Sequence, residues 1–267
     1  MKKHVAAAVV LGLVVLFVAF AWTLNSYKHR EFDERPANVP GTGIALQGEG
    51  MSDAEKAAAL SNSLYLHLDP ASALHRRLID RFDEIEILPG QDGAIAADDP
   101  ARPVKIRTWN VPESSNGRMS YTLTVVTGLV QGTDECLFIG EYRWLKPPFV
   151  RWGDRIYMEL HPAMFERTGE EEFHAMITFW NTKNQSVRTE KPLGNFSFGG
   201  QTAAKVPLPL KPGARDVITQ YWVSLTPTDM VFDGMAIQTL LFYAHLGNAQ
   251  QGRDFTWECP RTEDAIN

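Results

Sequence analysis

The stretch "MSYTLTVVTGLVQGTDECLFIGEYRWL", residues 119–145, decides the fold class. It contains two short runs, 119–130 and 135–145, that are rich in β-branched and aromatic residues. Glycine and aspartate lie between the runs, and these residues favour turns over regular structure. The stretch therefore predicts two strands of a β-sheet.

Runs of the same character lie on both sides of this stretch. They are "KIRTWNV" (105–111), "RIYMELH" (155–161), "FHAMITFWN" (173–181) and "DVITQYWVSL" (216–225). Strands and helices do not alternate along the chain as they do in parallel-sheet proteins. Residues 84–267 are therefore predicted to form a mainly β, antiparallel, β-sandwich-like domain.

The end of the chain gives a mixed signal. "MAIQTLLFYAHLGNAQQG", residues 235–252, is so continuously apolar that its period does not separate a helix from a strand, and we favour a helix. "RDFTWECP", residues 253–260, predicts a final strand that Pro260 ends.

Residues 51–83 predict a small helical hairpin, which makes the class α+β overall. Ser52 followed by Glu55 forms the capping box of a first helix. Asp69 before Pro70 is the predicted cap of the second. Its apolar face is predicted to consist of Leu74, Leu78, Ile79 and Phe82.

An uncharged apolar segment, "VAAAVVLGLVVLFVAFAWTL", covers residues 5–24. About 20 such residues cross a bilayer as a helix, so the segment predicts a transmembrane helix, with Trp22 and Tyr27 at the membrane interface. The alternative is a signal peptide cut after Ala21. Because the apolar run continues past that site, we favour a retained anchor.

This anchor sets the expected organisation of the chain. Residues 1–4 are predicted to be cytoplasmic, and residues 25–50, rich in proline and glycine, form a juxtamembrane linker. A long domain after a first apolar segment is usually translocated. We therefore expect a single-pass protein of the cytoplasmic membrane with an extracytoplasmic body, periplasmic in a bacterium.

Composition excludes some classes of function. The chain has 44% hydrophobic and 22% charged residues, which are ordinary globular values, and a net charge of −6. This charge does not suit nucleic-acid binding. The expected partners are the lipid bilayer, through residues 5–24, and other membrane or envelope proteins.

Cys136 and Cys259 are the two cysteines of the chain. A disulfide between them would close a long loop and suits an oxidising compartment, so we predict one. Two separate buried thiols are the alternative.

No strong catalytic motif is present, and no catalytic residue or cofactor is predicted. Glu159, His161 and His174 are weak candidates for zinc or iron ligands, because they lack the fixed spacing of known metal motifs. Gly199-Gly200 lacks the spacing of a phosphate-binding loop and predicts a hairpin turn instead.

Aromatic and basic residues alternate around Pro147-Pro148. Such residues are typical of contact surfaces, although tryptophans also fill cores. The predicted binding surface consists of Tyr142, Trp144, Phe149, Arg151 and Trp152.

Together these patterns predict a non-catalytic, membrane-anchored accessory or scaffolding subunit of a membrane or envelope complex. The alternative is an envelope carbohydrate-binding domain or metal-dependent hydrolase that uses residues 142–174. No motif indicates a known family.

Overall fold

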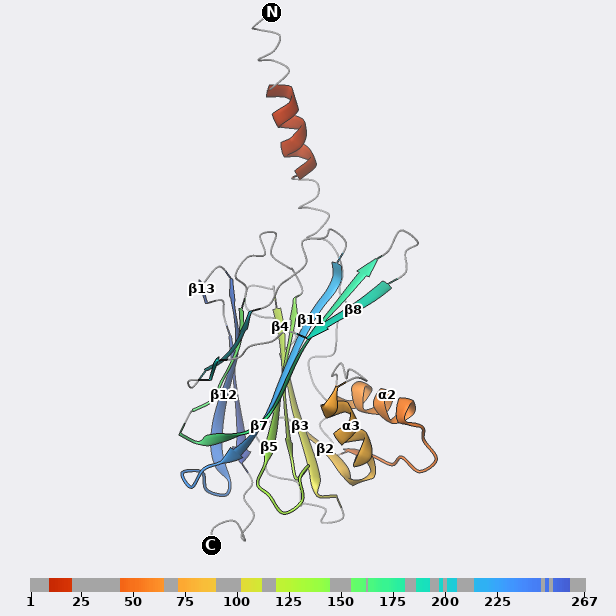
Figure 1. The fold of residues 1–267 in the computed structure, drawn as a ribbon, viewed down its shortest axis with the longest axis vertical. Helices are drawn as coiled ribbons and strands as arrows, with labels where there is room; N and C mark the ends of the chain where they lie inside the picture. The colour runs from red at the N-terminus through yellow and green to blue at the C-terminus, as the bar shows by residue number, and fades with distance from the viewer. Residues whose placement is uncertain are drawn as a thin grey trace, which may run out of the picture.

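The structure is a computed structural model that describes the chain in separate stretches. The described residues are 10–20, 44–64, 72–89, 102–111, 119–144, 155–161, 163–180, 186–192, 197–198, 201–205, 214–245, 248–249 and 252–259. Figure 1 shows that the body has three layers, with two sheets side by side and a helical pair against one of them.

The larger sheet, sheet A, has eight strands among the described residues, in the order β1-β2-β3-β4-β5-β11-β7-β8. The strands are β1 (Ile44–Ala45), β2 (Ile85–Pro89), β3 (Val104–Val111), β4 (Met119–Thr127), β5 (Cys136–Trp144), β7 (Phe165–Trp180), β8 (Ser186–Pro192) and β11 (Ala214–Pro227). Neighbours pair antiparallel, except that β2 and β3 are parallel. The first strand of sheet A, β1, lies within residues 25–50, the segment that the sequence predicted to be a juxtamembrane linker.

The second sheet, sheet B, runs in the order β13-β12-β6-β10-β9 in the described part, and β14 also pairs with β12. Its strands are β6 (Arg155–Glu159), β9 (Ser197–Phe198), β10 (Gln201–Lys205), β12 (Met235–His245), β13 (Asn248–Ala249) and β14 (Arg253–Cys259). β9 and β10 pair antiparallel, while Gly199-Gly200, where a hairpin turn was predicted, lie outside the described residues. The prediction of a mainly β, sandwich-like, α+β domain is confirmed.

One apolar core lies between the two sheets. Phe138 of sheet A is at its centre, fully buried, with its ring centroid 5.4 Å from Phe165 and 5.3 Å from Trp257 of sheet B. Both contacts are edge-to-face, the geometry that aromatic rings prefer. The residues of each strand that face this core are the apolar ones that the two sheets bury between them.

A second core lies on the opposite face of sheet A, under helices α2 (Asp53–Leu64) and α3 (Ala73–Asp80). Leu74, Leu78 and Ile79 of α3 are buried there, and so is Phe82 at the start of a short 3-10 helix, η1 (Phe82–Glu84). The predicted apolar face is confirmed. The hairpin therefore covers part of the outer face of sheet A.

The two helix starts were predicted with unequal success. At α2 the capping box forms, since the Ser52 N–H donates to Glu55 Oε2 at 2.8 Å and the Glu55 N–H donates to Ser52 Oγ at 3.4 Å. At α3 the prediction of Asp69 as the cap is wrong. Ser72 caps that helix, with its Oγ accepting from the Leu74 N–H at 3.1 Å, and Asp69 lies outside the described residues.

The helix predicted after residue 235 is also wrong, because that segment is strand β12. Ile237, Leu241 and Tyr243 point into the core at the period of a strand. On the other face, Phe242 stacks on Tyr157 of the neighbouring strand at 4.4 Å. Apolar residues on both faces concealed the alternation in the sequence.

Near the N-terminus, residues 10–20 form a helix whose large apolar side chains are 44–71% exposed (Figure 1). Among the described residues, no helix is both long enough and apolar enough to cross a bilayer. The predicted transmembrane helix over residues 5–24 is therefore unsupported here. Its predicted interface residues, Trp22 and Tyr27, lie outside the described residues.

The predicted disulfide is absent, because Cys136 and Cys259 are both buried thiols. They enter the same core from β5 of sheet A and β14 of sheet B. The pKa of the Cys136 thiol is raised well above its ordinary value, mainly by a hydrogen bond with Cys259 and to a smaller extent by burial. Folding thus brings the two cysteines together, as the sequence suggested, without the covalent bond.

Candidate functional site

Of the five residues predicted to form a binding surface, the structure describes two, and both are buried. Tyr142 and Trp144 are fully buried between the sheets, where Tyr142 Oη donates to the carbonyl of Tyr157 at 2.5 Å. These two residues fill the core and cannot contact a partner. Phe149, Arg151 and Trp152 lie outside the described residues.

The three weak metal candidates are divided between the two sheets. Glu159 ends β6 of sheet B, and His161 follows it as an exposed residue. His174 lies in β7 of sheet A, opposite Gln220. In the described stretches, no group of three or more His, Cys, Asp or Glu residues is placed to hold a metal ion.

A different feature of the surface stands out, namely the turn between β11 and β12, residues 228–234. Met230 is 59% exposed and Phe232 is 64% exposed. Outside the helix at residues 10–20, they are the exposed large hydrophobic side chains of the described chain. We call this segment the 228–234 turn.

The two exposed side chains flank a buried one. Val231, between them, is 3% exposed and belongs to the core between the sheets. Val231 thus fastens the middle of the turn to the core, while the side chains on both sides of it are exposed to the solvent.

Hydrogen bonds hold the start of the 228–234 turn against the segment before β7. The Thr228 N–H donates to the carbonyl of Met164 at 2.9 Å, and its Oγ1 donates to the carbonyl of Ala163 at 2.7 Å. Thr228 Oγ1 also accepts from the Met230 N–H at 3.4 Å. One threonine thus ties the turn to a neighbouring loop.

The rest of the turn is held by its own backbone and by β14. The Val231 N–H donates to the carbonyl of Thr228, and the Met235 N–H to that of Phe232, each at 3.0 Å. The Gly234 N–H donates to the carbonyl of Cys259 at 3.0 Å. The apolar side chains are consequently presented on an ordered, braced backbone.

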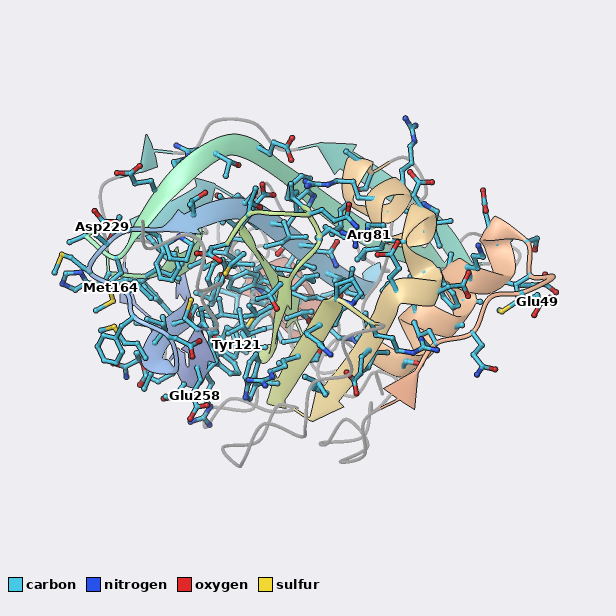
Figure 2. The ribbon with its side chains drawn as sticks, turned by 90° about the horizontal axis from the view of Figure 1, so that it is seen from below. Glu49, Arg81, Tyr121, Met164, Asp229 and Glu258 are labelled. Carbon is cyan, nitrogen blue, oxygen red and sulfur yellow. The ribbon has the colours of Figure 1, made fainter. Side chains whose placement is uncertain are left out.

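Exposed carboxylates lie in the turn and on two strands next to it. Asp229 and Asp233 belong to the turn itself, while Glu166 and Glu258 lie on adjacent strands, opposite Thr226 and Ala236. Figure 2 shows Met164, Asp229 and Glu258 on one side of the molecule, away from Arg81. Arg167, next to Glu166 in the sequence, is half-buried.

The 228–234 turn has the composition of a contact site. It has two large apolar side chains on a hydrogen-bonded backbone, with an aspartate next to each of them in the sequence. Exposed apolar groups bordered by polar ones are typical of protein interaction sites.

Sequence reasoning missed this site because "TPTDMVFDG" has the composition of an ordinary turn. The available signal was the pair of large apolar residues, Met230 and Phe232, inside a turn otherwise rich in threonine and aspartate. Whether an apolar residue of a turn is buried or exposed depends on how the turn packs against the core, which the sequence of the turn does not show.

No protein-family model matches the chain, and no curated protein matches it. Partial likeness exists to solved structures of streptococcal proteins. The C-terminal domain of the Streptococcus pyogenes antigen I/II-family protein AspA is 8% identical with a TM-score of 0.34, covering 52% of this chain and 53% of that one. The KRT10-binding region domain of the pneumococcal serine-rich repeat protein PsrP is 15% identical with a TM-score of 0.27, covering 58% and 97%.

The C-terminal domain of the Streptococcus agalactiae AgI/II polypeptide BspA gives a similar result, with 6% identity, a TM-score of 0.35, and coverage of 52% and 57%. The chain thus spans about half the length of the antigen I/II structures that it matches. Likeness at this level carries no argument about function.

Proposed function

We propose that this chain is a non-catalytic accessory subunit of a membrane or envelope protein complex, and that the 228–234 turn is its contact site. The observation that carries the proposal is the exposure of Met230 and Phe232 on a braced turn. A rigid β-sandwich that displays two apolar side chains suits protein binding.

Membrane anchoring is the second part of the proposal. The helix at residues 10–20 is apolar on all sides and exposed, a pattern that suits a lipid environment better than water. The apolar segment 5–24 that contains it has the length needed to reach across a bilayer. On this proposal the sandwich works outside the cytoplasm, held near the membrane by that segment.

Fractionation of native membranes tests the anchor. The full chain is expected to stay in the membrane pellet through an alkaline carbonate wash, and its amino terminus is expected to precede Val5. A mature amino terminus at Trp22, or full release by the wash, would overturn the anchored part of the proposal.

Native electrophoresis of mildly solubilised membranes tests the subunit role. The chain is expected to migrate in a complex larger than its 29.9 kDa mass, and the double variant Met230→Ser/Phe232→Ser is expected to shift it to the free position. Gln238→Ser is the matched control, because this exposed residue lies on β12 beyond the turn. Migration of the unchanged protein as a free monomer would refute the subunit role.

A further inference from the structure

We infer that the outer face of sheet B carries a second binding site, which takes a neutral glycan and stacks one of its sugar rings on Tyr157. The outer face is the one turned away from sheet A and the helical pair, which both lie on the other side of sheet B (Figure 1). This site is separate from the 228–234 turn and goes beyond the proposed function.

Alternation of burial identifies the residues of this face. Within β6, β12 and β14, buried side chains alternate with exposed or half-buried ones. Successive side chains of a strand point to opposite faces of the sheet, so the exposed and half-buried ones share the outer face. They are Tyr157 and Glu159 of β6, Ala236, Gln238, Leu240 and Phe242 of β12, and Asp254, Thr256 and Glu258 of β14.

The pairing of the strands arranges these residues in rows. Phe242 lies directly opposite Tyr157, which in turn lies opposite Ala203 of β10. In the next row Glu159 lies opposite Gln201. Directly opposite residues have Cβ atoms about 5 Å apart, and positions i and i+2 of one strand are about 7 Å apart. The two aromatic residues and the carboxylate of Glu159 are therefore close neighbours on one face.

The ring of Tyr157 is supported by Phe242 on one side only. The two rings are stacked, with centroids 4.4 Å apart and planes within 6°, so each covers one face of the other. Beyond Phe242 there is no room for a ligand, because a Cβ at Gly252 would lie 2.5 Å from Phe242 Cβ and 2.9 Å from Leu240 Cδ1. Beyond Tyr157 the opposite residue is Ala203, whose side chain is a single methyl group. The second face of the Tyr157 ring is the one left for a ligand.

A sugar ring has the chemistry that this arrangement requires. The C–H groups on one side of a pyranose are slightly positive and match the negative face of an aromatic ring. Its hydroxyl groups are hydrogen-bond donors, and the carboxylate of Glu159, two residues after Tyr157, is an acceptor. Glu159 is half-buried, and hydrogen bonds to carboxylates are stronger than those between neutral groups.

The charges on this face select a neutral glycan. Every charged side chain that the structure describes on the face is a carboxylate, namely Glu159, Asp254 and Glu258. Arg155 lies at the other end of β6, beyond Tyr157, where it is opposite Ala244. Like charges placed together oppose association, so glycans that carry uronic or sialic acid are disfavoured beside Glu159.

A protein partner suits this face less well. The exposed large hydrophobic side chains of the described chain lie at residues 10–20 and in the 228–234 turn, and none is on the outer face of sheet B. A stable protein interface buries about 800 Å² on each partner around desolvated anchor residues. One aromatic ring beside a carboxylate matches the size of one or two sugar units instead.

Isothermal titration calorimetry of the full chain tests the inference. The chain is kept in a detergent that has no sugar headgroup. The probes are neutral hexasaccharides of glucose, mannose, galactose and N-acetylglucosamine, with hexagalacturonic acid as the anionic counterpart. We expect at least one neutral hexasaccharide to bind, and the anionic one to bind more weakly or not at all.

Variants decide whether the glycan uses this face. Tyr157→Leu is expected to weaken binding about tenfold through loss of stacking, and Tyr157→Phe, which keeps a ring, is expected to bind more tightly than Tyr157→Leu. Glu159→Gln is also expected to weaken binding about tenfold, because it replaces a charged acceptor by a neutral one. Glu49→Gln is the matched control and should not change the affinity. Glu49 is exposed and lies on the opposite side of the molecule from Glu258 (Figure 2). Circular dichroism of each variant checks that it is folded.

The outcomes are distinct. Binding of a neutral hexasaccharide that both Tyr157→Leu and Glu159→Gln weaken would support the site. It would be overturned if no neutral hexasaccharide binds, if hexagalacturonic acid binds more tightly, or if both variants leave the affinity unchanged. A face that contacts another protein instead would give the first of these three results. Migration in native electrophoresis reports on the 228–234 turn, so the subunit role is judged independently.

Discussion

Replacement of Gly128 by alanine tests how tightly two neighbouring strands meet. Gly128 follows β4 with a φ of +71°, and a Cβ placed there would lie 2.0 Å from the carbonyl oxygen of Pro103. The obstacle is backbone just before β3, so it cannot rotate away as a side chain would. In addition, Arg81 Nη1 donates to the Gly128 carbonyl at 2.8 Å, which ties the end of α3 to the same point.

Gly132 supplies a matched control, because its φ is +73° and nothing lies within 4 Å of its Cβ position. Gly132→Ala therefore reports the conformational term alone, about 1 kcal/mol of lost stability. Gly128→Ala adds a steric clash, for which overpacking typically costs about 1–3 kcal/mol. The expected total for Gly128→Ala is about 2–4 kcal/mol.

The difference in stability between the two variants is measured by thermal unfolding of the full chain in detergent, with tryptophan fluorescence as the signal. For a body of this size, 1 kcal/mol lowers Tm by about 2–4 °C. Gly128→Ala should thus lower Tm by about 4–16 °C, and Gly132→Ala by about 2–4 °C. On this reasoning, residue 128 must be glycine because of the close strand contact as well as its positive φ. Equal decreases of Tm in the two variants would refute it.

Two other predictions concern the first helix and the thiols. The hydrogen bond from Ser52 lowers the pKa of Glu55 below 4.5, so the capping box should stabilise α2 above that pH and lose its effect as the pH falls through the lowered pKa. Ser52→Ala should lower stability at pH 7, and by less once the pH is below the lowered pKa of Glu55; an equal loss on both sides of that pKa would contradict this account. Cys136 and Cys259 should react slowly with a thiol reagent in the folded chain, and both should react without reductant once it is unfolded. Failure to detect two thiols in unreduced, unfolded protein would show that a disulfide had formed.

The positions of several strands along the chain could be predicted from the sequence alone. Runs such as 119–130 and 135–145 became β4 and β5, because β-branched and aromatic residues favour strands. The capping box at Ser52 was equally local, since both of its partners lie within three residues. Patterns of this kind need no knowledge of the rest of the fold.

Burial and proximity were decided only by the tertiary structure. The sequence could not show that Tyr142 and Trp144 fill the core instead of a binding surface, because aromatic residues serve both roles. It left β12 ambiguous, because Phe242 stacks outside the core on Tyr157.

The candidate contact site depends on tertiary structure for the same reason. Val231 enters a core built by strands distant in the sequence, and that contact turns Met230 and Phe232 outwards. The sequence shows which apolar residues the turn contains. Only the packing of the two sheets determines which of them is buried and which faces the solvent, because the core that Val231 enters is formed by strands far apart in the chain.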